Sequence, residues 1–293
     1  MTAPRAPEMP ATVKGMLYMM TATSLSACTA AIVRHVSSDL PPFEIAFFRN
    51  LFGFCILLVM VTPYGLAPFR TKRFGLLATR AGLDLGSMLS YYTALSLTPL
   101  AKAVALFFTT PLIATVLAVA VLGERLKPRR IVALVAGFAG TWVILRPGVV
   151  DVGTGPLLVI LAATLWAVAM MIIKTAARTE SSLTQSLYMA MIATPVSLVA
   201  ALPVWRGPDI DQIAWLALLG TLGGFGDWCV AQAFRKADAT AVVPVDFMRL
   251  LFAAVIGYLA FAEIPDVWTW IGAAVIVGAV TAIALRERRA GSQ

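Results

Sequence analysis

The chain has 293 residues, of which 60% are hydrophobic and 13% are charged, and its formal net charge is +8. Soluble domains usually contain about 25% charged residues. The composition therefore excludes a soluble enzyme, a disordered chain and a nucleic-acid-binding protein, and it predicts an integral membrane protein. In such a protein the excess of Lys and Arg is expected in cytoplasmic loops.

Ten apolar stretches follow one another along the chain. A helix that crosses about 30 Å of hydrocarbon needs roughly 20 largely uncharged residues. The predicted spans are residues 13–34, 43–62, 74–97, 101–122, 129–146, 155–174, 183–203, 212–234, 239–262 and 267–285. The short connections between them leave no room for a soluble domain.

The distribution of Lys and Arg predicts the orientation of these spans. If the chain starts in the cytoplasm, most of its 23 Lys and Arg residues fall in cytoplasmic segments, as the positive-inside rule requires. An even number of spans then returns the chain to the same side. Residues 1–11 and 287–293 are therefore expected to be short cytoplasmic tails.

The two halves of the chain resemble each other weakly. One constant shift places Val104 on Val243, Phe108 on Phe247 and Glu124 on Glu263. These matches predict two units, residues 12–148 and 153–286. Because each unit has five spans, the second crosses the membrane upside down relative to the first, which is typical of alternating-access carriers.

Ionisable side chains occur inside the predicted spans, where each costs about 2.5–3.5 kcal/mol on insertion scales. Arg80 and Asp84 are four residues apart, and Asp246 and Arg249 are three apart, so each pair can meet on one helix face. Such pairs either line a water-filled cavity that binds a charged or zwitterionic solute, or lock helices together. Asp227 has no basic residue within one turn, which makes it the better candidate for a protonatable switch.

Aromatic side chains and prolines complete the predicted site. Aromatic rings within the spans could line the cavity, although lipid contact is the alternative. Pro111 and Pro244 interrupt corresponding spans of the two units, which is typical of a hinge or a binding site. The predicted substrate cavity comprises Arg49, Arg80, Asp84, Tyr91, Tyr92, Phe108, Trp166, Asp227, Trp228, Asp246 and Arg249, with Pro111 and Pro244 as hinges.

The stretch from Ala94 to Gly148, with its Pro111-Leu-Ile and Leu122-Gly-Glu-Arg-Leu motifs, resembles the EamA type of the drug/metabolite transporter superfamily. The second half is similar more loosely, and it lacks the glycine before Glu263. The resemblance implies an all-α membrane fold of ten helices in two inverted five-helix repeats around a central cavity. It also implies a multi-pass protein of the bacterial inner membrane.

Within that superfamily, Phe47-Phe-Arg49 and the Asp246-Phe-x-Arg249 pattern are similar to bacterial exporters of amino acids and related metabolites. The resemblance implies export of amino acids, including aromatic ones, by alternating access as a facilitated uniporter. The alternatives are a proton-coupled exporter of drugs or other metabolites and, from another class, a membrane channel.

The sequence lacks the motifs of an enzyme, a metal site or a cofactor site. The chain has no glycine-rich phosphate loop and no cluster of aspartates for magnesium diphosphate, so it is not predicted to be an enzyme. His35 is the only histidine, and neither a metal site nor a cofactor is expected. The predicted partners are a small-molecule substrate and the lipid bilayer, with no obligatory protein partner.

Overall fold

The computed structural model describes residues 11–65, 67–122, 128–146, 153–176, 179–236 and 245–291. All regular structure within these residues is helical. The helices are α1 (Ala11–Val36), α2 (Pro42–Val61), α3 (Phe74–Leu97), α4 (Leu100–Phe107), α5 (Thr110–Leu122), α6 (Pro128–Leu145), α7 (Thr154–Ala176), α8 (Ser182–Ala201), α9 (Ile210–Lys236), α11 (Met248–Phe261) and α12 (Val267–Gly291), with single 3-10 turns at Thr62–Tyr64, Ala67–Phe69 and Leu202–Val204.

Helix length and apolar composition fit a membrane protein. Among the described residues, apolar stretches of 20 to 24 residues, long enough to cross a bilayer, lie in α1, α7 and α9 and in α2 and α8 together with the 3-10 turns that follow them. Helix α3 is 24 residues long and carries Arg80 and Asp84 within it. Shorter apolar segments lie in α4–α5, α6, α11 and α12.

The fourth predicted span, 101–122, is wrong as a continuous helix, because the chain breaks between α4 and α5 at Phe108 and Thr109. Pro111 has no backbone N–H to donate to the preceding turn. The hydroxyl of Thr110 instead donates to the carbonyl of Phe107 at 2.7 Å, and that of Thr109 donates to Leu106 at 2.8 Å. The hydroxyl of Thr110 thus serves the carbonyl of Phe107, which would otherwise accept from residue 111. The carbonyl of Leu106, by contrast, also accepts from the backbone N–H of Thr109 at 3.0 Å.

Most contacts between helices have an equivalent contact in which the helices of the first and second halves of the chain change places. Corresponding helices pack against each other in the pairs α2 with α8 and α6 with α12, and the contact of α1 with α11 has its equivalent in that of α7 with α5. The remaining principal contacts occur as equivalents: α3 with α7 and α9 with α1, and α2 with α9 and α8 with α3. A two-fold relation between the repeats requires such exchange.

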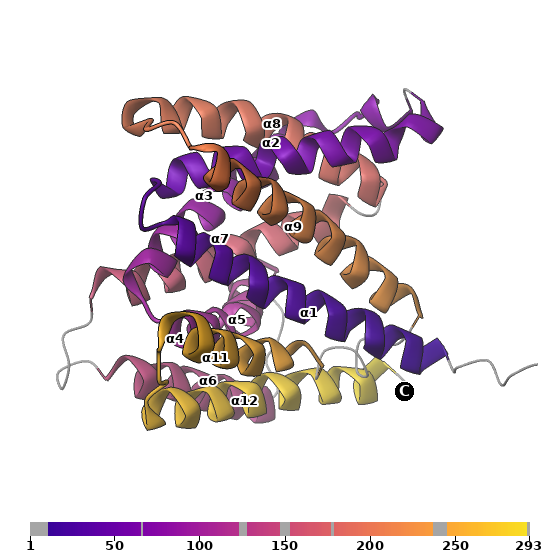
Figure 1. Cartoon of the computed structure of the whole chain (residues 1–293). Helices are drawn as coiled ribbons and strands as arrows, with labels where there is room; N and C mark the ends of the chain where they lie inside the picture. Colours follow the sequence, from indigo (N-terminus) through magenta and orange to yellow (C-terminus); the bar gives the residue numbers. More distant parts are fainter. Residues whose placement is uncertain are drawn as a thin grey trace, which may run out of the picture.

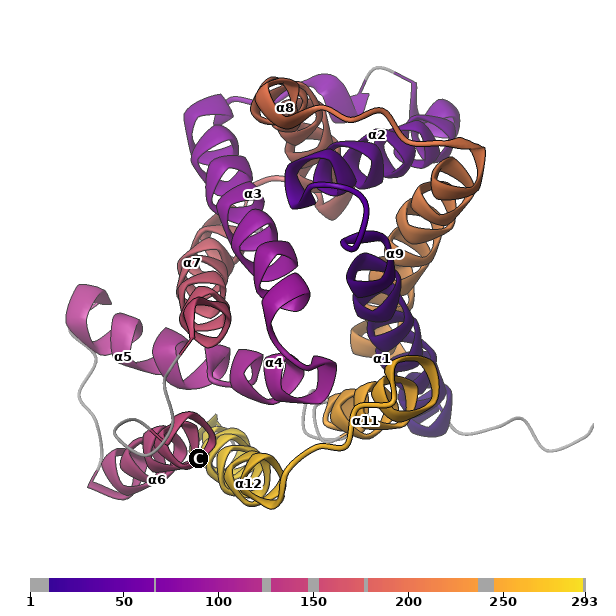
Figure 2. The ribbon, with the colours of Figure 1, turned by 60° about the vertical axis from the view of Figure 1, so that its left-hand side comes forward.

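Figure 1 shows these pairs as successive layers, from α2 and α8 at one end to α6 and α12 at the other. In Figure 2, α3 and α7 form one side of the bundle and α1 and α9 form the opposite side. The prediction of an all-α membrane fold in two five-helix repeats is confirmed.

Candidate functional site

One group of ionisable side chains lies where α2, α3, α8 and α9 pack together. We call Arg49, Arg80, Asp84, Tyr92 and Asp227 the Arg49 cluster. Nε of Arg80 lies 3.1 Å from Oδ2 of Asp84, and its Nη1 donates to Gln185 on α8 at 3.3 Å. The Asp84 side chain is almost fully buried, at 1% exposed.

Arg49 extends from α2 into this group without forming an ion pair. Its guanidinium interacts electrostatically with Tyr92, Asp227 and Asp84. Among the described residues its one hydrogen bond runs from Nη1 to Sδ of Met88, at 3.4 Å. Thioether sulfur is a weak acceptor, so the guanidinium keeps most of its capacity to donate to a further group.

Asp227 reaches the same region from α9. Its carboxylate interacts electrostatically with Arg49 and Arg80, yet it makes no ion pair or hydrogen bond with them or with any other described residue. The residue is exposed rather than packed under its neighbours. Both arginines lie on other helices, Arg49 on α2 and Arg80 on α3, and a role of Asp227 in proton transfer stays a prediction.

A second group lies where α1, α4 and α11 meet, and we call Phe108, Tyr91, Asp246 and Arg249 the Arg249 cluster. Nη2 of Arg249 donates to Asp246 at 2.8 Å, and Nη1 lies 3.5 Å from the hydroxyl of Ser26. The Cζ atom of Arg249 lies 5.1 Å from the centre of the Phe108 ring, within cation–π distance.

Aromatic rings extend the Arg249 cluster. The centres of the Phe108 and Phe247 rings are 5.1 Å apart, with an interplanar angle of 60°. Those of Tyr91 and Phe107 are 4.9 Å apart, at 51°. Tilted rings at these separations attract one another. The cluster therefore combines a partly exposed ion pair with an aromatic wall.

The two clusters are connected through neighbouring residues of α3. Tyr91 interacts electrostatically with Arg249, and Tyr92 interacts with Arg49 and Asp227. Because successive residues of a helix point about 100° apart, α3 presents one tyrosine to each cluster. A solute that reached both clusters would contact the charged groups of the Arg49 cluster at one end and the aromatic wall beside the Asp246–Arg249 pair at the other.

The remaining predicted site residues join neither cluster. Trp228 forms ring contacts with Tyr18 and Phe225, with centres 5.7 and 5.5 Å away. Trp166 is partly buried and makes no hydrogen bond or ring contact with the described part of the chain. Pro111 lies in the first turn of α5, next to the helix break, and Pro244 lies outside the described residues.

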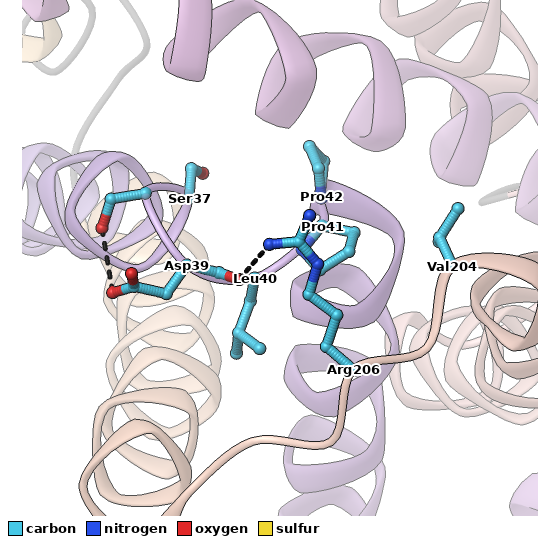
Figure 3. A pocket seen from close by; sticks show the side chains of 8 residues that line it. Ser37, Asp39, Leu40, Pro41, Pro42, Val204 and Arg206 are labelled. Atoms are coloured by element: carbon cyan, nitrogen blue, oxygen red, sulfur yellow. Dashed lines mark hydrogen bonds between the residues drawn. The ribbon is translucent and has the colours of Figure 1, made fainter.

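Two open cavities lie at the end of the bundle that is predicted to face outward, which we call the outer end (residues 34–44, 95–100, 202–210 and 261–267). The larger, about 460 Å³, is lined by residues 37–42, Val204 and Arg206. Figure 3 shows Arg206 reaching across it to the backbone carbonyl of Asp39, with a hydrogen bond of 3.0 Å. The smaller, about 320 Å³, is lined by Arg34, His35 and Phe261, among others. None of the predicted site residues lines either cavity.

The outer end is held by ionic contacts that the sequence did not indicate. Arg34 of α1 forms an ion pair with Glu263, which follows α11. Nη1 of Arg34 also donates to the carbonyls of Leu95 and Thr98, and Glu263 accepts from the backbone N–H of Leu100 at 2.8 Å. These contacts join α1, α3, α4 and α11, and therefore both repeats.

Glu44 makes a similar contact at the start of α2. Its carboxylate is fully buried and accepts hydrogen bonds from the backbone N–H groups of Arg206 and Gly207, at 3.1 and 3.0 Å. A buried carboxylate needs such donors. Glu44 therefore anchors the connection between α8 and α9 onto α2. In the part of the chain that the structure describes, no three His, Cys, Asp or Glu residues gather where they could hold a metal ion.

A helical bundle of two repeats, with paired charges and aromatic rings inside its spans, is the arrangement of a membrane carrier. The chain belongs to the EamA-like transporter family, whose model matches residues 13–146 and 153–285. It is therefore a multi-pass membrane transporter.

Named relatives are similar along nearly the whole chain. An S-adenosylmethionine uptake transporter of Rickettsia prowazekii is 32% identical over 278 residues, with 95% of each chain covered. A riboflavin transporter of Vibrio cholerae is 32% identical over 286 residues and 94% of each chain. A pseudopaline exporter of Pseudomonas aeruginosa is 26% identical over 282 residues, which is 94% of this chain and 97% of the relative.

A solved crystal structure with 20% sequence identity has the same fold, with a TM-score of 0.66 and coverage of 94% of this chain and 98% of that chain. The predicted transporter class is confirmed by the family match. These relatives are not named for amino acids, and they include both uptake and export. The predicted export of amino acids therefore stays a prediction.

Proposed function

We propose that this protein carries S-adenosylmethionine, or a metabolite that likewise joins an amino-acid zwitterion to an aromatic ring system, across the bacterial inner membrane. The observation that supports it is the placement of Arg49 and Asp227. Their opposite charges interact without forming an ion pair, and Gly223, which faces the guanidinium of Arg49, lies one turn from Asp227 on α9. Arg49 and Asp227 leave a cation and an anion available to one zwitterionic solute.

The chemistry of S-adenosylmethionine matches the two clusters. Its α-carboxylate fits a guanidinium such as that of Arg49, and its ammonium group fits the carboxylate of Asp227. The adenine ring and the sulfonium cation suit an aromatic wall such as the one around Phe108, through stacking and cation–π attraction. The names of the Rickettsia relatives support the same substrate.

Riboflavin is the second candidate, because riboflavin transporters of Vibrio cholerae and Brucella anthropi are also similar to this chain. Its ring system fits the aromatic part of the Arg249 cluster, but it has no amino-acid zwitterion. The two substrates therefore make different demands on Arg49 and Asp227. Transport is proposed to involve no covalent change in the solute.

The test is counterflow in proteoliposomes preloaded with unlabelled S-adenosylmethionine, following the labelled compound, with riboflavin, phenylalanine, threonine and methionine as competitors. We expect uptake that Arg49→Gln and Asp227→Asn reduce by roughly 10-fold or more, the value of one charged hydrogen bond. Gly278→Ala, at a residue of α12 outside the predicted cavity with nothing within 4 Å of its Cβ position, should retain wild-type uptake. If labelled S-adenosylmethionine is not taken up, the same assay is run with each competitor labelled. Counterflow of riboflavin alone, unaffected by Arg49→Gln, would establish the second candidate, and counterflow of phenylalanine, threonine or methionine alone would support the amino-acid prediction.

The same proteoliposomes show whether transport is coupled to the movement of protons. Concentrative uptake under an imposed pH gradient, abolished by a proton ionophore, would indicate a proton-coupled carrier. Counterflow that ignores the ionophore would indicate a uniporter. A current that does not saturate with substrate would instead support a channel.

A further inference from the structure

Three glycines of α9, Gly220, Gly223 and Gly224, have different surroundings. A Cβ atom on Gly220 would lie 2.7 Å from Cβ of Phe52 and 3.2 Å from the carbonyl oxygen of Arg49, so the backbones of α9 and α2 touch there. Gly220 is thus the glycine that allows the close crossing of the two helices. Gly224, at Gly-x-x-x-Gly spacing from it, has nothing within 4 Å of its Cβ position.

Gly223 faces the charged part of the Arg49 side chain. A Cβ atom on it would lie 3.5 Å from Nη2, 3.6 Å from Nε and 3.8 Å from Cζ of Arg49. These are ordinary van der Waals distances, so a methyl group fits there without strain and would cover part of one side of the guanidinium. In the described structure that side lies against a residue that has no side chain.

We infer that Gly223 determines specificity: because it has no side chain, the guanidinium of Arg49 stays uncovered and binds the carboxylate of the transported solute. The inference rests on the proposed function, in which the solute is zwitterionic. The crossing at Gly220 brings α2 close enough for Arg49 to lie beside Gly223. Asp227, one turn further along α9, is then placed for the cationic group of the same solute.

A packing role for Gly223 predicts something different. If the glycine served helix contact, a methyl group would clash, as it does at Gly220, and alanine would disturb the fold. The distances at Gly223 allow alanine, which is also a better helix former than glycine. Gly223→Ala is therefore expected to fold, and Gly224→Ala is the matched control on the neighbouring residue.

The first measurement needs no substrate. Purified protein in proteoliposomes is treated with phenylglyoxal, and the modification of Arg49 is followed by mass spectrometry relative to the exposed Arg206. We expect Gly223→Ala to slow modification of Arg49 by about 10-fold, the effect of blocking one charged contact, while Gly224→Ala leaves it at the wild-type rate. Equal rates in all three proteins, or no reaction of wild-type Arg49, would overturn the inference.

The second measurement compares binding of S-adenosylmethionine with that of its decarboxylated form. Gly223→Ala should weaken the first by about 10-fold and leave the second unchanged, and Gly224→Ala should affect neither. Equal weakening of both compounds would show that the glycine acts through packing. If the wild-type protein binds neither compound, the proposed substrate is wrong, and the modification rates still decide whether Gly223 keeps Arg49 uncovered.

Discussion

Removal of the charge on Glu263 is expected to weaken the outer end of the bundle. Glu263→Gln keeps the shape of the side chain and an acceptor for the N–H of Leu100, but it removes the ion pair with Arg34. Arg34 then retains only its hydrogen bonds to the carbonyls of Leu95 and Thr98. Glu263→Gln therefore tests the contribution of the ion pair alone.

The expected loss in the free energy of unfolding depends on how deeply the ion pair is buried. Exposed ion pairs are worth about 0.2–1 kcal/mol, and removal of one partner from a buried pair costs about 3–5 kcal/mol. The side chains of Arg34 and Glu263 are 22% and 15% exposed, between these limits and nearer the buried one. We expect Glu263→Gln to lower the free energy of unfolding by about 3 kcal/mol, the lower end of the buried range.

The assay is reversible unfolding by SDS in mixed micelles, run as a double-mutant cycle with Arg34→Gln. The ion pair of Arg146 with Asp266 provides the matched control, because its side chains are 27% and 41% exposed and its coupling should stay below about 1 kcal/mol. The reasoning is refuted if the coupling of Arg34 with Glu263 is below about 0.5 kcal/mol or no larger than that of the control pair.

Two further predictions concern α12 and the loop before it. A Cβ atom on Gly272 would lie 2.5 Å from the carbonyl oxygen of Gly140, so Gly272→Ala should cost about 1–3 kcal/mol in the same unfolding assay, whereas Gly278→Ala, with nothing within 4 Å, should cost nothing. Burial alone would raise the pKa of Asp266, but hydrogen bonds from Thr269 outweigh it and lower that pKa. Its carboxylate therefore stabilises the fold at neutral pH and loses this effect as the pH falls below about 4. Asp266→Asn should lower the melting temperature at about pH 7 and converge with the wild type near about pH 3, and parallel curves would contradict this.

The spans could be predicted from sequence because lipid imposes one simple demand, a long apolar helix. The predicted span 74–97 coincides with α3 despite its two charges. The break in the fourth span was not predicted, although Pro111 was recognised, because a proline in a membrane helix produces either a kink or a break. Here the helix breaks, and the hydroxyl of Thr110 donates to the carbonyl of Phe107, which Pro111 cannot serve.

Contacts within one helix could also be predicted, and contacts between helices could not. The spacings of Arg80 with Asp84 and of Asp246 with Arg249 predicted two pairs that the structure contains. The partner of Arg34 lies more than two hundred residues away, and no local pattern indicates it. The position of Gly223 beside Arg49 likewise follows only from the crossing of α2 and α9.

The repeat explains the scaffold better than it explains the site. The shift that places Phe108 on Phe247 in sequence relates two rings that touch each other, as equivalent residues near a two-fold axis must. The same shift places Met88 on Asp227, Phe107 on Asp246 and Thr110 on Arg249, so these charges have no counterpart in the first repeat. The helix packing is duplicated, whereas Asp227, Asp246 and Arg249 are not. A symmetric scaffold with asymmetric charges favours one orientation of an asymmetric solute, which is what recognition of a zwitterion at one end and an aromatic ring at the other requires.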